Sequence, residues 1–131
     1  MTSRLHNVTV DCADPVAMAN FWAAVTGYEQ HPDNGVAPED DEALLLPPGD
    51  GPGILFLRVP EGKAVKNRLH LDLQPDRPRD EEVERILALG ATMVLDMRRP
   101  DGRGWAQLAD PEGNEFCVER SAAERAAMGD E

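Results

Sequence analysis

The sequence predicts an α+β fold in which a β-α-β-β-β module occurs twice in succession. Each half begins with an alternating segment typical of a strand, and a helix with clear start and stop residues follows it. Three short strand candidates come after each helix. The triplet Arg-Leu-His also stands at the start of both first strands, at residues 4–6 and 68–70. An internal repeat explains this recurrence, and although chance identity of three letters stays open, the order of elements does not depend on it.

The first half opens with LHNVTVDC at residues 5–12, whose alternation and content of Val and Thr predict a strand. A helix should follow, because Asp14 suits the N-cap, Pro15 the first helical position and Gly27 the residue after the last turn. Helical spacing places four large apolar residues on its inner face: Met18, Phe21, Trp22 and Val25. Three further strands are expected at GYEQH, EALLLP and GILFLRVP, separated by acidic loops rich in Pro and Gly.

The second half repeats this plan. RLHLDLQ, at residues 68–74, alternates like a strand. RPRDEEVERILALGA predicts a helix that ends at Gly90. Strands are then expected at TMVLDM, WAQLAD and EFCVER, and DPEG at residues 110–113 should form the turn between the last two.

Composition narrows the classes of function. The chain has 131 residues, 41% hydrophobic and 29% charged, which suits one globular domain. A formal net charge of −12 argues against binding to nucleic acid or to anionic membranes, because both require a basic surface. The sequence shows neither an apolar run of about 20 residues nor the apolar region of a signal peptide, so we expect a cytoplasmic protein. Cys12 and Cys117 fit that compartment as free thiols, although their number also permits one disulfide.

Several phrases resemble a known family. CADPVAMANFWAAVTGY in the first half, and RLHLDL, ALGA and LADPEGNEFCV in the second, are similar to the vicinal oxygen chelate superfamily, which includes glyoxalase I, bleomycin-resistance proteins and extradiol dioxygenases. The closest likeness is to small glyoxalase-like proteins. The resemblance implies a curved mixed sheet, or incomplete barrel, that encloses a cleft. It also implies a homodimer, and a divalent metal ion in those members that are enzymes.

The resemblance covers about residues 4–120. We therefore expect a single glyoxalase-like domain over residues 1–120, with module one at about 4–60 and module two at about 67–120. Residues 121–131 should be a polar tail, either a frayed helix or disordered, without chemistry of its own.

Alternation of side chains along strands predicts which residues face the cleft. In the fifth strand Leu69, Leu71 and Leu73 should pack under a helix, which leaves Arg68, His70 and Asp72 on the cleft side. The same argument assigns four more residues to the cleft side: Phe56 and Arg58 in the fourth strand, and Glu115 and Cys117 in the last. His6 has the opposite parity from His70, so the two histidines should not share one ion.

The positions at which the resemblance implies metal ligands carry Asn7, Phe56, Arg68 and Cys117. Because Arg repels a cation and Phe offers no lone pair, we expect no metal ligands and no obligatory metal or other cofactor. Donors would have to come from His70, Asp72, Glu115 and Cys117, which keeps a metal-dependent site open as the alternative.

The predicted function is a glyoxalase-like protein that holds a small organic ligand in its cleft. The expected ligand-binding residues combine aromatic and polar side chains: Phe56, Arg58, Arg68, His70, Trp105, Gln107, Glu115 and Cys117. The alternative is an enzyme of the same fold, a lyase, isomerase or hydrolase, that acts on a small oxygenated metabolite. His70 and Asp72 would then be the catalytic residues.

Overall fold

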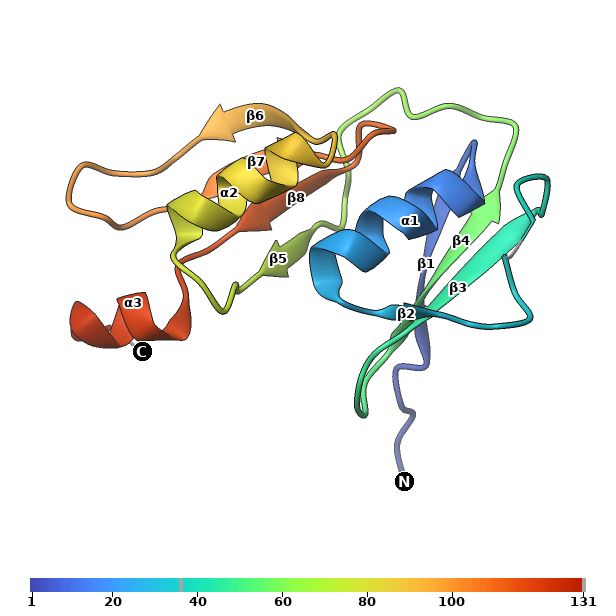
Figure 1. Cartoon of the computed structure of the whole chain (residues 1–131), viewed down its shortest axis with the longest axis horizontal. Helices are drawn as coiled ribbons and strands as arrows, with labels where there is room; N and C mark the ends of the chain where they lie inside the picture. The colour runs from blue at the N-terminus through green and yellow to red at the C-terminus, as the bar shows by residue number, and fades with distance from the viewer. Residues whose placement is uncertain (36, 131) are drawn as a thin grey trace. The chain divides into compact units, whose positions relative to one another are not determined.

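A computed structural model of the chain describes residues 1–35 and 37–130 (Figure 1). The chain divides into two compact units, residues 1–64 and 65–131. Each unit has the element order β-α-β-β-β, and a third helix follows in the second unit. The predicted α+β class and the two modules are therefore confirmed. Each unit contains an open, mixed four-stranded sheet that is not closed into a barrel.

The first unit forms a sheet of order β1-β4-β3-β2, in which β1 and β4 are parallel and the other pairs antiparallel. Its elements are β1 (Asn7–Cys12), α1 (Pro15–Thr26), β2 (Glu29–Gln30), β3 (Glu42–Leu46) and β4 (Gly53–Arg58). Helix α1 packs against β3 and β4.

Helix α1 begins and ends where the sequence predicts. The Asp14 carboxylate accepts a hydrogen bond from the backbone N–H of Ala17 at 3.1 Å, and Pro15 opens the first turn. Gly27 closes the helix in the left-handed conformation, with φ of 78°. The four predicted core residues of this helix are all buried.

The predicted faces of β4 are wrong. Phe56 has no exposed surface and Ile54 is also buried, whereas Leu57 is exposed. The segment ILFL is apolar at every position, so its sequence has no alternation of apolar and polar residues that could distinguish the buried face from the exposed one. Phe56 therefore belongs to the core of the first unit. Arg58 lies at the end of the strand, where it bonds Asp41 at 3.2 Å and the backbone carbonyl oxygen of Ala13.

The second unit forms a sheet of order β5-β8-β7-β6, with β5 and β8 parallel. Its elements are β5 (Leu71–Leu73), α2 (Arg79–Ala88), β6 (Thr92–Asp96), β7 (Ala106–Ala109), β8 (Glu115–Val118) and α3 (Ala122–Ala127). Because β5 begins only at Leu71, Leu69 lies outside the sheet. Its side chain is exposed, contrary to the prediction that it packs under a helix.

One face of this sheet is the core of the second unit. Val83 and Ile86 of α2 are completely buried, as are Phe116 and Val118 of β8 and Leu108 of β7. The alternation predicted for β8 is therefore correct, and it directs Cys117 to the opposite face.

The predicted turn after β7 is stabilised by Asp110, which is buried. Its carboxylate accepts hydrogen bonds from the backbone N–H groups of Glu112 and Asn114, at 2.9 and 3.0 Å. The segment expected to be a polar tail contains helix α3, whose Ser121 and Glu124 form a capping box. Among the described residues, no helix is both long and apolar enough to cross a membrane.

Candidate functional site

Three neighbouring strands of the second unit present polar side chains on the face opposite α2. Asp72 of β5 is the register partner of Cys117 in β8, and Cys117 is the partner of Gln107 in β7. Partners in adjacent strands point to the same side of a sheet. The three side chains therefore form a row across the sheet, and His70, just before the start of β5, lies next to Asp72.

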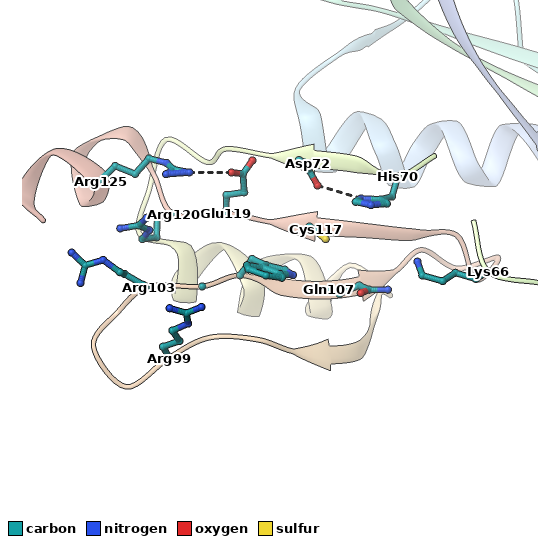
Figure 2. A pocket seen from close by; sticks show the side chains of 12 residues that line it. Lys66, His70, Asp72, Arg99, Arg103, Gln107, Cys117, Glu119, Arg120 and Arg125 are labelled. Carbon is teal, nitrogen blue, oxygen red and sulfur yellow. Dashed lines mark hydrogen bonds and ion pairs between the residues drawn. The ribbon is translucent and has the colours of Figure 1, made fainter. Parts of the chain in front are cut away.

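This row forms part of the wall of a cavity of about 620 Å³. The two ends of this cavity carry different side chains, as Figure 2 shows. Arg99, Arg103, Arg120 and Arg125 gather at one end, and His70, Gln107 and Lys66 lie toward the other, with Asp72 and Cys117 between them. The remaining lining residues are Gly104, Trp105 and Glu119. A cavity of this size with one aromatic side chain and several polar groups suits a small organic ligand.

His70, Asp72 and Cys117 bring three kinds of metal-ligand atom together. The His70 Nδ1 and Asp72 Oδ1 atoms are 3.3 Å apart. One ligand atom from each of the three residues lies within 4.8 Å of the other two. The histidine and the aspartate are exposed and the cysteine is buried, so the group is open to the cavity on one side.

Burial raises the pKa of the Cys117 thiol above its ordinary value of 9.0, and the neighbouring Asp72 carboxylate raises it further by charge and by hydrogen bonding. The free protein therefore holds a protonated thiol at neutral pH. A thiol in this state is a poor nucleophile. A cation beside it would favour the thiolate, because metal binding releases the thiol proton.

The three residues fit a divalent transition metal. A tetrahedral ion with bonds of about 2.0 to 2.3 Å separates its ligand atoms by roughly 3.3 to 3.8 Å. The observed limit of 4.8 Å exceeds this by about 1 Å, which a rotation of the exposed His70 or Asp72 side chain can supply. Imidazole, carboxylate and thiolate together suit zinc and related ions better than magnesium or calcium.

The structure brings together five of the predicted site residues in the second unit. His70, Asp72, Trp105, Gln107 and Cys117 line the cavity. Phe56 and Arg58 lie in the first unit, at the positions described above.

Two more predicted residues lie outside the lining. Glu115 precedes Cys117 in β8, and its carboxylate accepts a hydrogen bond from the backbone N–H of Asn67 at 2.8 Å. Arg68 precedes β5 and is exposed.

The arginine end of the cavity is not predicted by the sequence. Arg99 and Arg103 come from the turn between β6 and β7, and Arg120 and Arg125 from the segment after β8. A weak signal existed in RRPDGRGW at residues 98–105, where three arginines flank a glycine-rich turn in a chain with few basic residues. Nothing in the sequence joins that turn to the tail.

Arg79, at the first position of α2, holds the β6–β7 turn in place. Its side chain is buried, and one guanidinium nitrogen donates to the carbonyl oxygens of residues 102, 103 and 104, at 3.1, 3.0 and 3.0 Å. Gly104 is required in this turn: its φ is +89°, and an added Cβ would lie 2.0 Å from the Met97 carbonyl oxygen. The backbone N–H of Arg79 donates to Glu124 at 2.7 Å, which ties α3 to the same place.

Comparison with known proteins agrees with this architecture. The family model described as "Glyoxalase-like domain" matches residues 7–119. The chain belongs to the glyoxalase-like domain family. The resemblance to the vicinal oxygen chelate superfamily, predicted from the sequence phrases, is thereby confirmed. No curated protein matches the chain.

Solved structures share the fold of this glyoxalase-like protein. A glyoxalase/bleomycin resistance protein/dioxygenase family enzyme from Burkholderia phytofirmans PsJN is 23% identical, with a TM-score of 0.65 over 88% of this chain and 97% of that one. The fosfomycin resistance protein FosX from Mesorhizobium loti is 19% identical, with a TM-score of 0.69 over 97% and 99%.

A variant of FosX from Listeria monocytogenes, complexed with Mn(II) and 1S,2S-dihydroxypropylphosphonic acid, is 23% identical, with a TM-score of 0.68 over 95% of each chain. At these identities the likeness concerns the fold alone.

The prediction of a cleft without a metal or cofactor is wrong. The second unit contains a three-donor group of His70, Asp72 and Cys117, and the Listeria FosX structure of the same fold is complexed with Mn(II). The fifth-strand position at which the resemblance implies a ligand carries Arg68, which does not line the cavity. The residues that line it beside Cys117 are His70 and Asp72, two and four positions later.

Proposed function

We propose that this glyoxalase-like protein binds a small oxygenated organic molecule in the cavity of its second unit, beside a divalent metal ion held by His70, Asp72 and Cys117. The observation that carries the proposal is the grouping of these three donors within 4.8 Å at the wall of a 620 Å³ cavity. What is known of the Listeria FosX complex, a metal ion together with a hydroxylated organic molecule, supports the same combination here.

Each donor would have a distinct part in holding the ion. The carboxylate of Asp72 brings negative charge, the imidazole of His70 must be neutral at the coordinating nitrogen, and Cys117 must release its thiol proton. When bound, such an ion supplies Lewis acidity toward an oxygen of the ligand. Trp105, which is 39% exposed, offers an aromatic surface to the organic part, and the Gln107 amide offers both a donor and an acceptor.

The second candidate function is an enzyme of the same site, a lyase, isomerase or hydrolase. Three protein ligands favour it, because catalytic zinc sites characteristically use three side chains and leave a position open to water or substrate. If the protein is an enzyme, His70→Ala should abolish turnover of the substrate. If it only binds, no candidate ligand should be converted in the presence of the metal.

A metal titration tests the proposal. Protein freed of metal with a chelator would be titrated with Zn²⁺ and with Mn²⁺ by isothermal calorimetry. We expect one ion per chain, and a loss of about tenfold or more in affinity for His70→Ala and for Asp72→Asn. His6→Ala is the matched control, since His6 belongs to the other Arg-Leu-His triplet and should leave the affinity unchanged. Equal behaviour of the two histidine variants would refute the site.

We propose further that the two modules make a single glyoxalase-like domain over residues 1–120, and that the protein is a cytoplasmic homodimer. The family resemblance supports the domain and the dimer. Cys12 and Cys117 are not joined in a disulfide, which is in keeping with a reducing compartment. Sedimentation velocity would test the dimer, and a monomer at micromolar concentration would contradict it.

A further inference from the structure

The cavity concentrates positive charge in an acidic protein. Five cationic side chains line it against two carboxylates, although the chain as a whole carries a net charge of −12. The cations are Lys66, Arg99, Arg103, Arg120 and Arg125, and the carboxylates are Asp72 and Glu119. Glu119 forms an ion pair with Arg125, with 3.3 Å between Glu119 Oε1 and Arg125 Nη2. The cavity lining thus has three more cationic side chains than carboxylates, and this excess of positive charge favours an anionic ligand.

Two of these arginines converge on a single oxygen atom. Arg120 Nη1 lies 2.7 Å from Asp130 Oδ2, and Arg103 Nε lies 3.2 Å from the same oxygen. The Arg120 side chain is only 10% exposed. A guanidinium so deeply buried is costly unless an anion pairs with it. The Arg103 and Arg120 side chains therefore share one position for an oxyanion, and the Asp130 carboxylate occupies it.

Asp130 reaches this place from the segment after α3, where its backbone N–H donates to the carbonyl oxygen of Arg125 at 2.8 Å. The hydrogen bond from Arg120 lowers the pKa of Asp130 below its ordinary value of 3.8, and the charge of Arg103 lowers it further. Asp130 in turn raises the pKa of Arg103 by its charge. Asp130 and Arg103 are therefore both ionised at neutral pH. The Asp130 side chain is still 31% exposed, so a dissolved anion can reach the same two arginines.

We propose that Arg103 and Arg120 form an oxyanion subsite, which holds the Asp130 carboxylate in the free protein and exchanges it for the carboxylate or phosphoryl group of an incoming ligand. Asp130 then acts as a tethered competitor that weakens the binding of unsuitable anions. This inference deepens the proposed function and rests on it for the use of the cavity. It concerns the end opposite His70 and does not require a metal ion.

Anion titrations in the presence of a chelator test the subsite apart from the metal site. Inorganic phosphate and malonate would be titrated separately by calorimetry into the wild-type protein and into Asp130→Asn. Removing the tethered charge should tighten binding by about three- to tenfold. The comparison of the two probes shows whether a phosphoryl or a carboxylate group is preferred. Asp96→Asn is the matched control, because it removes a carboxylate that pairs with an arginine, Arg98, at 2.8 Å outside the cavity. It should leave the affinity unchanged.

Arg103→Gln and Arg120→Gln should each weaken binding below the wild-type level. If Arg120→Gln unfolds, which circular dichroism would reveal, the more exposed Arg103 decides the question. Anion affinity that is the same in Asp130→Asn and Asp96→Asn would overturn the proposal, as would binding that survives Arg103→Gln, or no binding of either probe at millimolar concentration. A failed metal titration together with these expected shifts would refute the metal site and leave the oxyanion subsite standing.

Discussion

Replacing Arg79 by Met should destabilise the protein strongly, because this one guanidinium holds the β6–β7 turn. The Nη1 atom of Arg79 carries two N–H groups and donates to three carbonyl oxygens at 3.0 to 3.1 Å. Two N–H groups can supply about two full hydrogen bonds. A hydrogen bond to a charged group contributes about 1.5 to 3 kcal/mol, so the loss should be about 3 to 6 kcal/mol. The ion pair with Asp80 adds little, since that carboxylate is 67% exposed.

Urea unfolding followed by circular dichroism measures this loss, which is a large part of the total stability of about 5 to 15 kcal/mol expected for a domain. Arg77→Met is the matched control. Arg77 is half exposed, and its nearest carboxylate, Glu82, remains bound to Arg85 at 2.7 Å without it. The control should cost less than about 1 kcal/mol. If Arg79→Met cost no more than Arg77→Met, the turn would not depend on the buried guanidinium, and the reasoning would be wrong.

Three further predictions concern the turn, the metal site and the tail. Asp110→Ala should lower the free energy of unfolding by about 2 to 3 kcal/mol in a urea titration, because two backbone N–H groups lose their acceptor; an unchanged midpoint would contradict this. Metal affinity should rise by up to about tenfold per pH unit between pH 6 and 8, because the raised pKa of the Cys117 thiol means that metal binding must release the thiol proton. Calorimetry in buffers of different ionisation enthalpy counts the released proton. A pH-independent affinity would be evidence against a thiolate ligand. Although partial burial opposes it, hydrogen bonds from the backbone N–H groups of Ser121 and Arg79 lower the pKa of Glu124 below its ordinary 4.5. The stabilisation from Glu124 is therefore complete above that value and lost as the pH falls through the lowered pKa, so the urea midpoint of Glu124→Gln should vary less than that of the wild type from pH 5 to pH 3.

The fold could be predicted from the sequence because its signals are local. Asp14, Pro15 and Gly27 mark the ends of α1, and period-two alternation in β7 and β8 directs Gln107 and Cys117 to the polar face. Alternation fails in β4, where both faces are apolar, so that it predicts Phe56 in the cleft although Phe56 is a core residue.

The group of His70, Asp72 and Cys117 and the arginine end show why the cavity lining is predictable only in part. Alternation directs His70 and Asp72 to the cavity face, but which residue lies beside Cys117 depends on where β5 starts, and a strand of three residues does not reveal this in the sequence. Arg103 and Arg120 meet only because α3 folds back on the β6–β7 turn and Arg79 binds that turn. Such tertiary contacts leave no pattern in the sequence.

The most direct test of the central claim is a cobalt spectrum. Metal-free protein loaded with one equivalent of Co²⁺ should show the near-ultraviolet charge-transfer band of a thiolate–cobalt bond, since thiolate ligands suit such ions. The band should disappear in Cys117→Ser and persist in Cys12→Ser, whose cysteine lies buried in the first unit. A spectrum without that band in the wild type, or one unchanged by Cys117→Ser, would show that His70, Asp72 and Cys117 do not form a metal site.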